Sequence, residues 1–191
     1  IAFDAGQVFS TYKYTDSQGQ IKDFSTNITG CFNLSYHYIS SSGLFIRAAL
    51  GMRKGGASLE YNQTNVKWNV QYADASLGAG YLLNRWRVKP YFNVSFFYAY
   101  MLKGEQTIHL DRYDIIKNKS MAPTDYGLYF IPGLKVALSN TISFYTEYRQ
   151  IFGLQNLEVS SGTNQKTYNR GFSVNLGIAV SIIKYNYVTT Q

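Results

Sequence analysis

Only two histidines occur in the 191 residues, so chemistry that needs an imidazole base is restricted to two places. His109 is followed by Asp111 and Asp114, with Ser120 further along, and this acidic cluster could orient a base or weakly hold a cation. His37 stands on a segment that alternates between polar and apolar residues. The motifs Gly-x-Ser-x-Gly and His-Glu-x-x-His are both absent. We therefore predict no catalysis, with His109 on a solvated loop and His37 in an internal polar network.

The segments around these residues follow the two-residue period of a β-strand. In residues 171–182, bulky apolar side chains alternate with Gly, Ser, Asn and Ala. A solvated sheet face would carry Lys, Glu and Thr instead of these small residues. Small residues suit the lumen of a narrow closed barrel whose apolar face meets lipid. The predicted lipid-facing residues include Phe92, Phe96, Phe172, Leu176, Ile178 and Val180.

The alternation predicts eight strands, over residues 3–14, 27–39, 44–54, 65–83, 88–100, 125–139, 142–154 and 171–182. Three short turns, near residues 41, 85 and 140, alternate with four longer connections, near 18, 60, 114 and 161. This favours an all-β fold, an eight-stranded antiparallel transmembrane up-and-down β-barrel in one domain over residues 1–191. The short turns and both termini are expected in the periplasm, and the longer loops outside. Opposite apolar parity before and after Tyr72 predicts a β-bulge between Tyr72 and Asp74.

Composition agrees with a membrane barrel. Aromatic residues make up 17% of the chain and charged residues 15%, which excludes disorder, and no apolar run is long enough for a transmembrane helix. Mean hydropathy is only −0.19, because lumen-facing residues average out the lipid-facing ones. Because the chain begins at Ile1 without Met, we expect that a signal peptide has been removed.

The cations and the single cysteine limit the partners that we expect. The net charge of +7 is scattered along the chain, which favours anionic lipid or lipopolysaccharide as a partner rather than nucleic acid. Because Cys31 is the single cysteine, an internal disulfide and a cysteine metal cluster are excluded. Its place on an alternating strand predicts a small side chain that faces the lumen. No cofactor and no metal are predicted.

Several ionisable residues share the lumen parity, and we predict a polar network from Asp4, His37, Arg47, Asp74, Lys89, Lys135, Glu147 and Arg149. Arg53 has the same parity. Side chains fill the interior of an eight-stranded barrel, so these charges must be paired. Glu147 or Asp74 is expected to pair with Arg47, Arg149 or Lys135 as a plug, and a conducting or proton-relaying lumen is the alternative. Aromatic residues near strand ends predict membrane-interface girdles, made of Tyr12, Tyr14, Tyr36, Tyr38, Trp86, Tyr98, Tyr100 and Tyr148.

The chain resembles the PorT-like outer-membrane β-barrel family of Bacteroidota and, more loosely, the small OmpA and OmpX barrels. The resemblance rests on five segments, at residues 3–6, 77–81, 131–134, 144–149 and 171–182. It implies an outer-membrane barrel, with some members tied to protein secretion or larger membrane assemblies.

The leading hypothesis for function is a non-enzymatic accessory or structural subunit of a larger complex for secretion, nutrient import or barrel assembly. One alternative is a standalone surface-binding or adhesion barrel. A lipid A-modifying enzyme that uses His109 or His37 is another. A soluble lipid-carrying barrel would place the bulky faces inward instead.

Overall fold

A computed structural model describes residues 1–61, 64–159 and 165–182. In these residues the chain forms strands and no helix, and therefore no helix long and apolar enough to cross a membrane. The strands are β1 (Ala2–Thr15), β2 (Ile21–Asp23), β3 (Ser25–Ile39), β4 (Leu44–Tyr61), β5 (Thr64–Leu82), β6 (Val88–Ile108), β7 (Asp111–Asp114), β8 (Thr124–Ala137), β9 (Ile142–Gly153) and β10 (Lys166–Val180).

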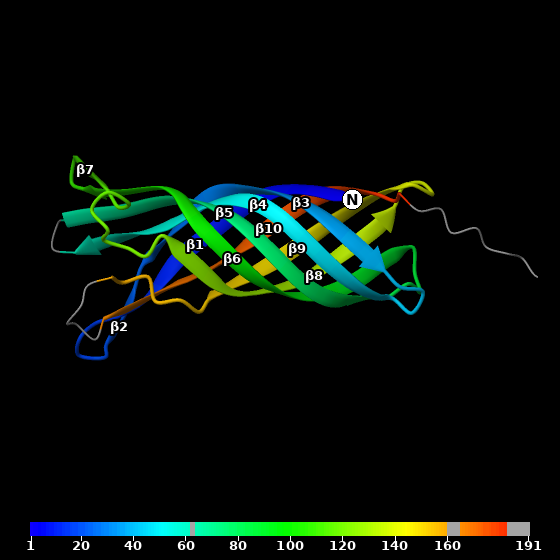
Figure 1. Cartoon of the computed structure of the whole chain (residues 1–191), viewed down its shortest axis with the longest axis horizontal. Coiled ribbons are helices and arrows are strands. Elements are labelled where there is room, and N and C mark those ends of the chain that lie inside the picture. The colour runs from blue at the N-terminus through cyan, green and yellow to red at the C-terminus, as the bar shows by residue number, and fades with distance from the viewer. Residues whose placement is uncertain (62–63, 160–164, 183–191) are drawn as a thin grey trace, which may run out of the picture.

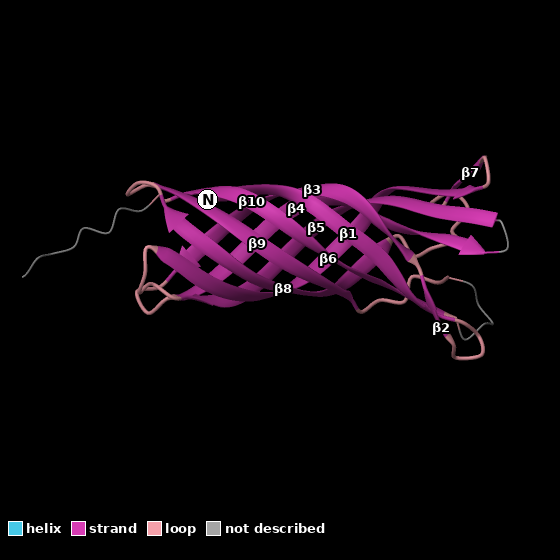
Figure 2. Ribbon diagram, turned by 180° about the vertical axis from the view of Figure 1, so that it is seen from behind, coloured by secondary structure: helices cyan, strands magenta, loops and turns pink. Residues whose placement is uncertain are grey.

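Eight long strands close into a barrel (Figures 1 and 2). Their order is β10-β9-β8-β6-β5-β4-β3-β1, every neighbouring pair is antiparallel, and β1 pairs with β10 from Ala2↔Ala179 to Thr15↔Lys166. The short strands β2 and β7 add to the ends of β1 and β6. The predicted eight-stranded antiparallel barrel is therefore confirmed.

The two ends of the barrel differ. One end carries the connections at residues 40–43, 83–87 and 138–141, together with the N-terminus, and is called the turn end below (Figure 1). The other end, called the mouth, carries β2, β7 and the longer connections (Figure 1). The strands β4, β5 and β6 are 18, 19 and 21 residues long, whereas the other five long strands have 12 to 15. The wall is therefore extended on one side of the mouth.

The connection predicted near residue 60 is mostly strand. Gly55 and Gly56 were expected to begin a loop, but β4 continues through both and pairs with β5 as far as Tyr61↔Thr64. The cross-strand hydrogen bonds continue past these glycines, so a glycine pair does not end this strand. Asn62, the third residue of the predicted loop, lies outside the described residues.

The parity of the side chains follows the predicted orientation. Leu176 and Ile178 are 56% and 53% exposed on the outer face, while Ser173 and Asn175 are at most 1% exposed inside. Phe92, Phe96 and Val180 are also exposed on the outer wall. Phe172 is half-buried on that face because its ring stacks on the rings of Phe9 and Tyr148. The large apolar side chains therefore cover the wall, as contact with acyl chains requires.

The predicted β-bulge lies on the neighbouring strand, and the change of side-chain parity that it was expected to cause in β5 does not occur. The register between β5 and β6 shifts between Gln71↔Lys103 and Tyr72↔Met101, so the extra residue is Leu102 of β6. The inward parity of β5 does not change, so Val70 and Tyr72 are buried inside the barrel. The apolar run at the start of β5 therefore belongs to the lumen and not to the wall.

Candidate functional site: the barrel lumen and its mouth

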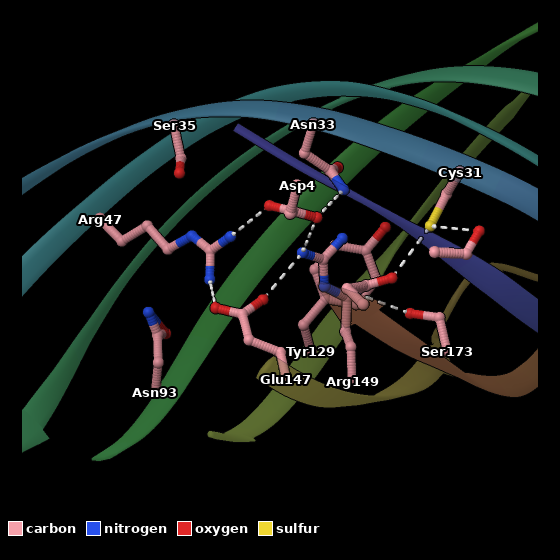
Figure 3. A network of polar contacts seen from close by, with 12 residues as sticks. Asp4, Cys31, Asn33, Ser35, Arg47, Asn93, Tyr129, Glu147, Arg149 and Ser173 are labelled. Atoms are coloured by element: carbon pink, nitrogen blue, oxygen red, sulfur yellow. Dashed lines mark hydrogen bonds and ion pairs between the residues drawn. The ribbon is translucent and has the colours of Figure 1, made fainter. Parts of the chain in front are cut away.

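A cluster of four ionised side chains crosses the lumen in the half nearer the turn end (Figure 3). Arg47 of β4 binds Asp4 of β1 at 3.3 Å, from Nη2 to Oδ2, and donates from Nη1 to Oε1 of Glu147 on β9. Arg149 Nη2 lies 3.5 Å from Asp4 Oδ1 and 3.3 Å from Glu147 Oε2. Two cations thus face two carboxylates, all at most 5% exposed, so the formal charges balance where water is excluded.

Neutral donors occupy the remaining carboxylate positions. Asn33 Nδ2 donates to Asp4 Oδ1 at 2.7 Å, and the Tyr145 hydroxyl donates to Asp4 Oδ2 at 3.1 Å. The Tyr91 hydroxyl donates to Glu147 Oε1 at 2.7 Å. Hydrogen bonds of this kind offset the cost of desolvating a buried carboxylate.

Glycines make room for the two tyrosines that enter the lumen here. A Cβ atom on Gly177 would lie 2.3 Å from the Tyr145 ring, and one on Gly133 would lie 2.4 Å from the Tyr91 ring. A larger residue would therefore displace the rings that hydrogen-bond the carboxylates. The small residues that face the lumen therefore provide the space for these rings.

A second ion cluster lies closer to the mouth. Arg53 of β4 donates from Nε to Asp74 Oδ2 at 3.2 Å and from Nη2 to Asp125 Oδ2 at 3.1 Å. Tyr129 donates its hydroxyl to Asp74 at 2.7 Å, and Asn169 Nδ2 donates to Asp125 at 3.1 Å. One arginine therefore faces two carboxylates. Within the described part of the chain, Nη1 of Arg53 and Oδ1 of Asp125 have no hydrogen-bond partner.

Aromatic rings join the two clusters. The Arg149 guanidinium lies 5.3 Å from the centre of the Tyr129 ring, which stacks on Phe97 at 4.3 Å. The Arg53 guanidinium lies 4.6 Å from the centre of the Tyr72 ring and 5.3 Å from that of Phe97. Cation–π contacts of desolvated arginines add to the ion pairs. The middle of the lumen is therefore filled with packed rings and paired charges.

The structure brings together five of the eight predicted network residues and leaves three apart. Asp4, Arg47, Glu147 and Arg149 form the first cluster, and Asp74 belongs to the second. The other three, His37, Lys89 and Lys135, are half-buried near the turn end.

Of the expected pairings, Glu147 pairs with Arg47 and Arg149, whereas Asp74 pairs with Arg53. Lys135 instead lies opposite Lys89 in the register of β8 and β6, and neither lysine forms an ion pair within the described ranges.

His37 and Cys31 take local packing positions. The Nε2 of His37 lies 2.9 Å from the Ser35 hydroxyl, and its ring stacks on Phe45. The Cys31 side chain is buried, with Sγ 3.2 Å from Oδ1 of Asn175 (Figure 3). In the part of the chain that the structure describes, no carboxylate is hydrogen-bonded to the His37 ring, and the Cys31 thiol lies against the oxygens of Gly6 and Asn175.

The second cluster contains residues that sequence reasoning missed. Asp125 stood at the first position of a predicted strand, but it shares the inward parity of Tyr129 and Ile131, and that parity was a usable signal. Arg53 had the right parity and was left out of the predicted network. The inward tyrosines carried no signal, because tyrosine also occurs in interface girdles.

Six of the eight predicted girdle residues lie on the outer surface, but the prediction was wrong for Tyr12 and Tyr14, because both face the lumen and line the cavity at the mouth. Tyr36, Tyr38 and Trp86 are near the turn end, Tyr98 is at the midpoint of β6, and Tyr100 is two residues closer to the mouth. Tyr148 is near the middle of β9, and its ring stacks on Phe172. Its position therefore indicates packing on the wall rather than a place in a ring at a strand end.

The predicted cluster of Asp111 and Asp114 around His109 is not formed. His109 adopts a positive φ of 54° in the tight turn between β6 and β7, and its backbone amide donates to Asn65. Asp114 accepts from the backbone amides of Ile116 and Lys117, so it shapes the following turn. No group of three potential metal ligands occurs among the residues that the structure describes. The geometry gives no support to a catalytic or metal site here.

The described residues line a cavity at each end of the lumen. The cavity near the turn end has a volume of about 20 Å³, which holds about one water molecule, and Tyr91, Tyr145 and Lys135 help to line it. The cavity at the mouth has a volume of about 520 Å³ and is lined by residues from β1, β4, β5, β6 and β10, including Tyr12 and Trp68. The two ion clusters lie between these ends, so the lumen is blocked in its middle.

A closed antiparallel barrel with an apolar outer wall and a charged, packed interior defines an outer-membrane β-barrel protein. Residues 2–179 match the family model described as outer membrane protein beta-barrel domain, and the chain belongs to this family. This membership supports a place in the bacterial outer membrane. The finer assignment to the PorT-like barrels of Bacteroidota stays a prediction.

Solved structures show the same fold at low sequence identity. Neisserial surface protein A is 16% identical, with a TM-score of 0.51, and the match covers 94% of this chain and 98% of that one. The outer membrane protein OprG from Pseudomonas aeruginosa is 11% identical, with a TM-score of 0.54 and 94% of each chain covered. No curated protein matches the sequence. Neither structure's name describes an enzyme, and the lack of catalysis in this chain stays a prediction.

Proposed function

We propose that this protein is a non-conducting outer-membrane barrel that acts as a surface-binding protein through its mouth. The observation that carries this proposal is the contrast between a lumen blocked by paired charges and a mouth that opens into a cavity of about 520 Å³. A blocked lumen leaves the strand ends and loops as the surfaces available to a ligand.

The extended wall at the mouth supports this proposal. Strands β4, β5 and β6 continue there as paired structure, and β7 adds to β6 through four register pairs. Paired strands hold side chains in fixed positions outside the membrane, as a preformed binding surface requires. The mouth faces the exterior in this proposal, and the turn end faces the periplasm.

Cysteine labelling on intact cells tests this orientation. In a Cys31→Ser background, Leu110→Cys places a thiol at a position that is 94% exposed at the mouth, and Arg85→Cys places one in a turn at the other end. A large maleimide that does not cross the outer membrane should label only the Leu110→Cys protein. Labelling of Arg85→Cys alone would contradict the proposal.

A role as accessory subunit is the second candidate, and one feature of the wall favours it. A groove of about 490 Å³ runs over the outer face of β3 to β6, with Ala48 and Ala75 between larger residues such as Leu50, Leu77 and Phe96. Such a groove could receive apolar side chains of a second membrane protein, with outer-membrane lipid or lipopolysaccharide around both.

Filling the groove tests the accessory role. The variant Ala48→Phe/Ala75→Phe adds bulk there, while Val174→Phe adds bulk to exposed wall on another strand. A protein that copurifies from gently solubilised membranes with the wild type and with Val174→Phe, but not with the groove variant, would support the role. A monodisperse lone barrel from wild-type membranes would contradict it.

A further inference from the structure

The cavity at the mouth has a lining that distinguishes it from the rest of the lumen. Three rings, of Tyr12, Phe24 and Trp68, meet edge to face, with centroids 6.2, 6.4 and 5.4 Å apart. Each ring fixes the other two, so this side of the cavity is rigid before any ligand arrives. Leu59 and Val66 extend the apolar lining. A rigid aromatic wall suits the flat face or edge of another ring.

The floor of this cavity closes it from below. Beneath the lining lies a cluster of buried apolar residues that includes Val70, Tyr72 and Met101, and the Arg53 ion cluster follows. The cavity is therefore a dead end that a molecule enters and leaves by the mouth. Its volume lies in the range of small-molecule sites.

Polar side chains are common in the lining and mostly neutral. Gln106, Ser120 and Gln165 contribute amide and hydroxyl groups to the lining, and Lys22 and Glu158 contribute one charge of each sign. Opposite charges cancel, so the lining offers hydrogen bonds and apolar contact but no net attraction for an ion.

We propose that the mouth cavity is a binding site for a neutral, ring-bearing small molecule with one or two hydrogen-bonding groups. This inference rests on the proposed surface-binding function and names its ligand class. The rings of the ligand lie against Phe24 and Trp68, and its polar group meets the amides and hydroxyls of the rim. A charged ligand would lose hydration without a matching excess charge in the lining.

The fluorescence of Trp68 provides a direct test. The chain has two tryptophans, and Trp86 lies in a turn at the opposite end, so Trp86→Phe leaves Trp68 as the single reporter. The purified protein in lipid nanodiscs is titrated with 4-nitrobenzyl alcohol, a neutral aromatic quencher with one hydroxyl. The anion 4-nitrobenzoate keeps the ring and replaces the hydroxymethyl group by a carboxylate.

Saturable quenching by the alcohol is expected, with the anion binding about tenfold more weakly. Gln106→Phe fills the cavity beside Trp68, its register partner, and should weaken binding about tenfold. Thr107→Phe, the next residue on the opposite face of β6, should leave binding unchanged. Ser120→Phe fills the cavity from an exposed segment, so it supplies a second test that does not depend on strand packing.

Quenching that rises linearly without saturation, or that is equal in the filled and control variants, would overturn the proposal. Tighter binding of the anion would overturn the ligand class. Because the assay uses purified protein, these results are independent of the labelling of intact cells. If the titration fails but maleimide labels only the Leu110→Cys protein on intact cells, the ligand proposal is wrong and the proposed orientation still holds.

Discussion

The two halves of the lumen are built from side chains of the same parity, and along β5 these side chains have opposite chemistry. On β5, the inward positions toward the turn end are Gly80, Gly78, Ser76 and Asp74, while those toward the mouth are Tyr72, Val70, Trp68 and Val66. In the first half small residues leave room for the paired ions and for the rings of Tyr91 and Tyr145, and in the second the apolar side chains lie between the Arg53 cluster and an open cavity. Inward parity fixes where a side chain points but not its polarity.

The largest effect is expected from the ion cluster in the first half. Arg47→Ala leaves Asp4 and Glu147 with Arg149 as their one remaining guanidinium partner among the described residues, so one buried carboxylate loses its charge compensation. The free energy of unfolding should fall by about 3–5 kcal/mol, measured by urea titration in lipid vesicles. Arg85→Ala, in an exposed turn, should change it by no more than about 0.5 kcal/mol. Equal losses would show that the cluster is not a stabilising unit.

The second-largest effect on stability is expected from the packed aromatic rings in the lumen. Phe97 is fully buried and stacks on Tyr129, whereas its neighbour Phe96 is 50% exposed on the wall. Phe97→Ala should therefore cost about 3 kcal/mol through the cavity that it leaves, and Phe96→Ala clearly less. The same urea titration measures both. A larger loss for Phe96→Ala would mean that the wall, and not the lumen, determines stability.

Two tyrosines in the middle of the lumen give the smallest and sharpest comparison. The Tyr129 hydroxyl donates to Asp74 at 2.7 Å, whereas the Tyr72 hydroxyl has no partner within the described segments. Tyr129→Phe should lower the free energy of unfolding by about 1.5–3 kcal/mol. Tyr72→Phe removes a buried group that forms no bond, so it should be neutral or stabilising by about 1 kcal/mol. A loss of the same size in both variants would contradict this account of the second ion cluster.

The fold was predictable from the sequence because lipid on one side and a narrow lumen on the other impose a strict two-residue period. Residues 171–182 show that period directly, and the alternation of short and long connections follows from antiparallel closure. The apolar inward run at the start of β5 was misread because apolar residues were taken to face lipid, although the lumen near the mouth is apolar.

The network was only partly predictable. The parity of a residue shows whether its side chain faces the lipid or the lumen. It does not show at which level along the barrel axis the tilted strands bring two side chains together. Arg47 and Glu147 pair, which is one of the expected pairings, while Arg53, which was left out of the predicted network, pairs with Asp74. The mouth cavity depends on contacts among β1, β4, β5, β6 and β10, which are remote in sequence, so no local pattern predicted it.

Conductance in a planar lipid bilayer tests the central claim, a lumen closed by paired charges, most directly. The purified wild-type barrel should insert without producing stepwise ionic current across the usual range of voltages. Stable open-channel steps from the wild type would contradict the blocked lumen and, with it, the proposed restriction of function to the mouth.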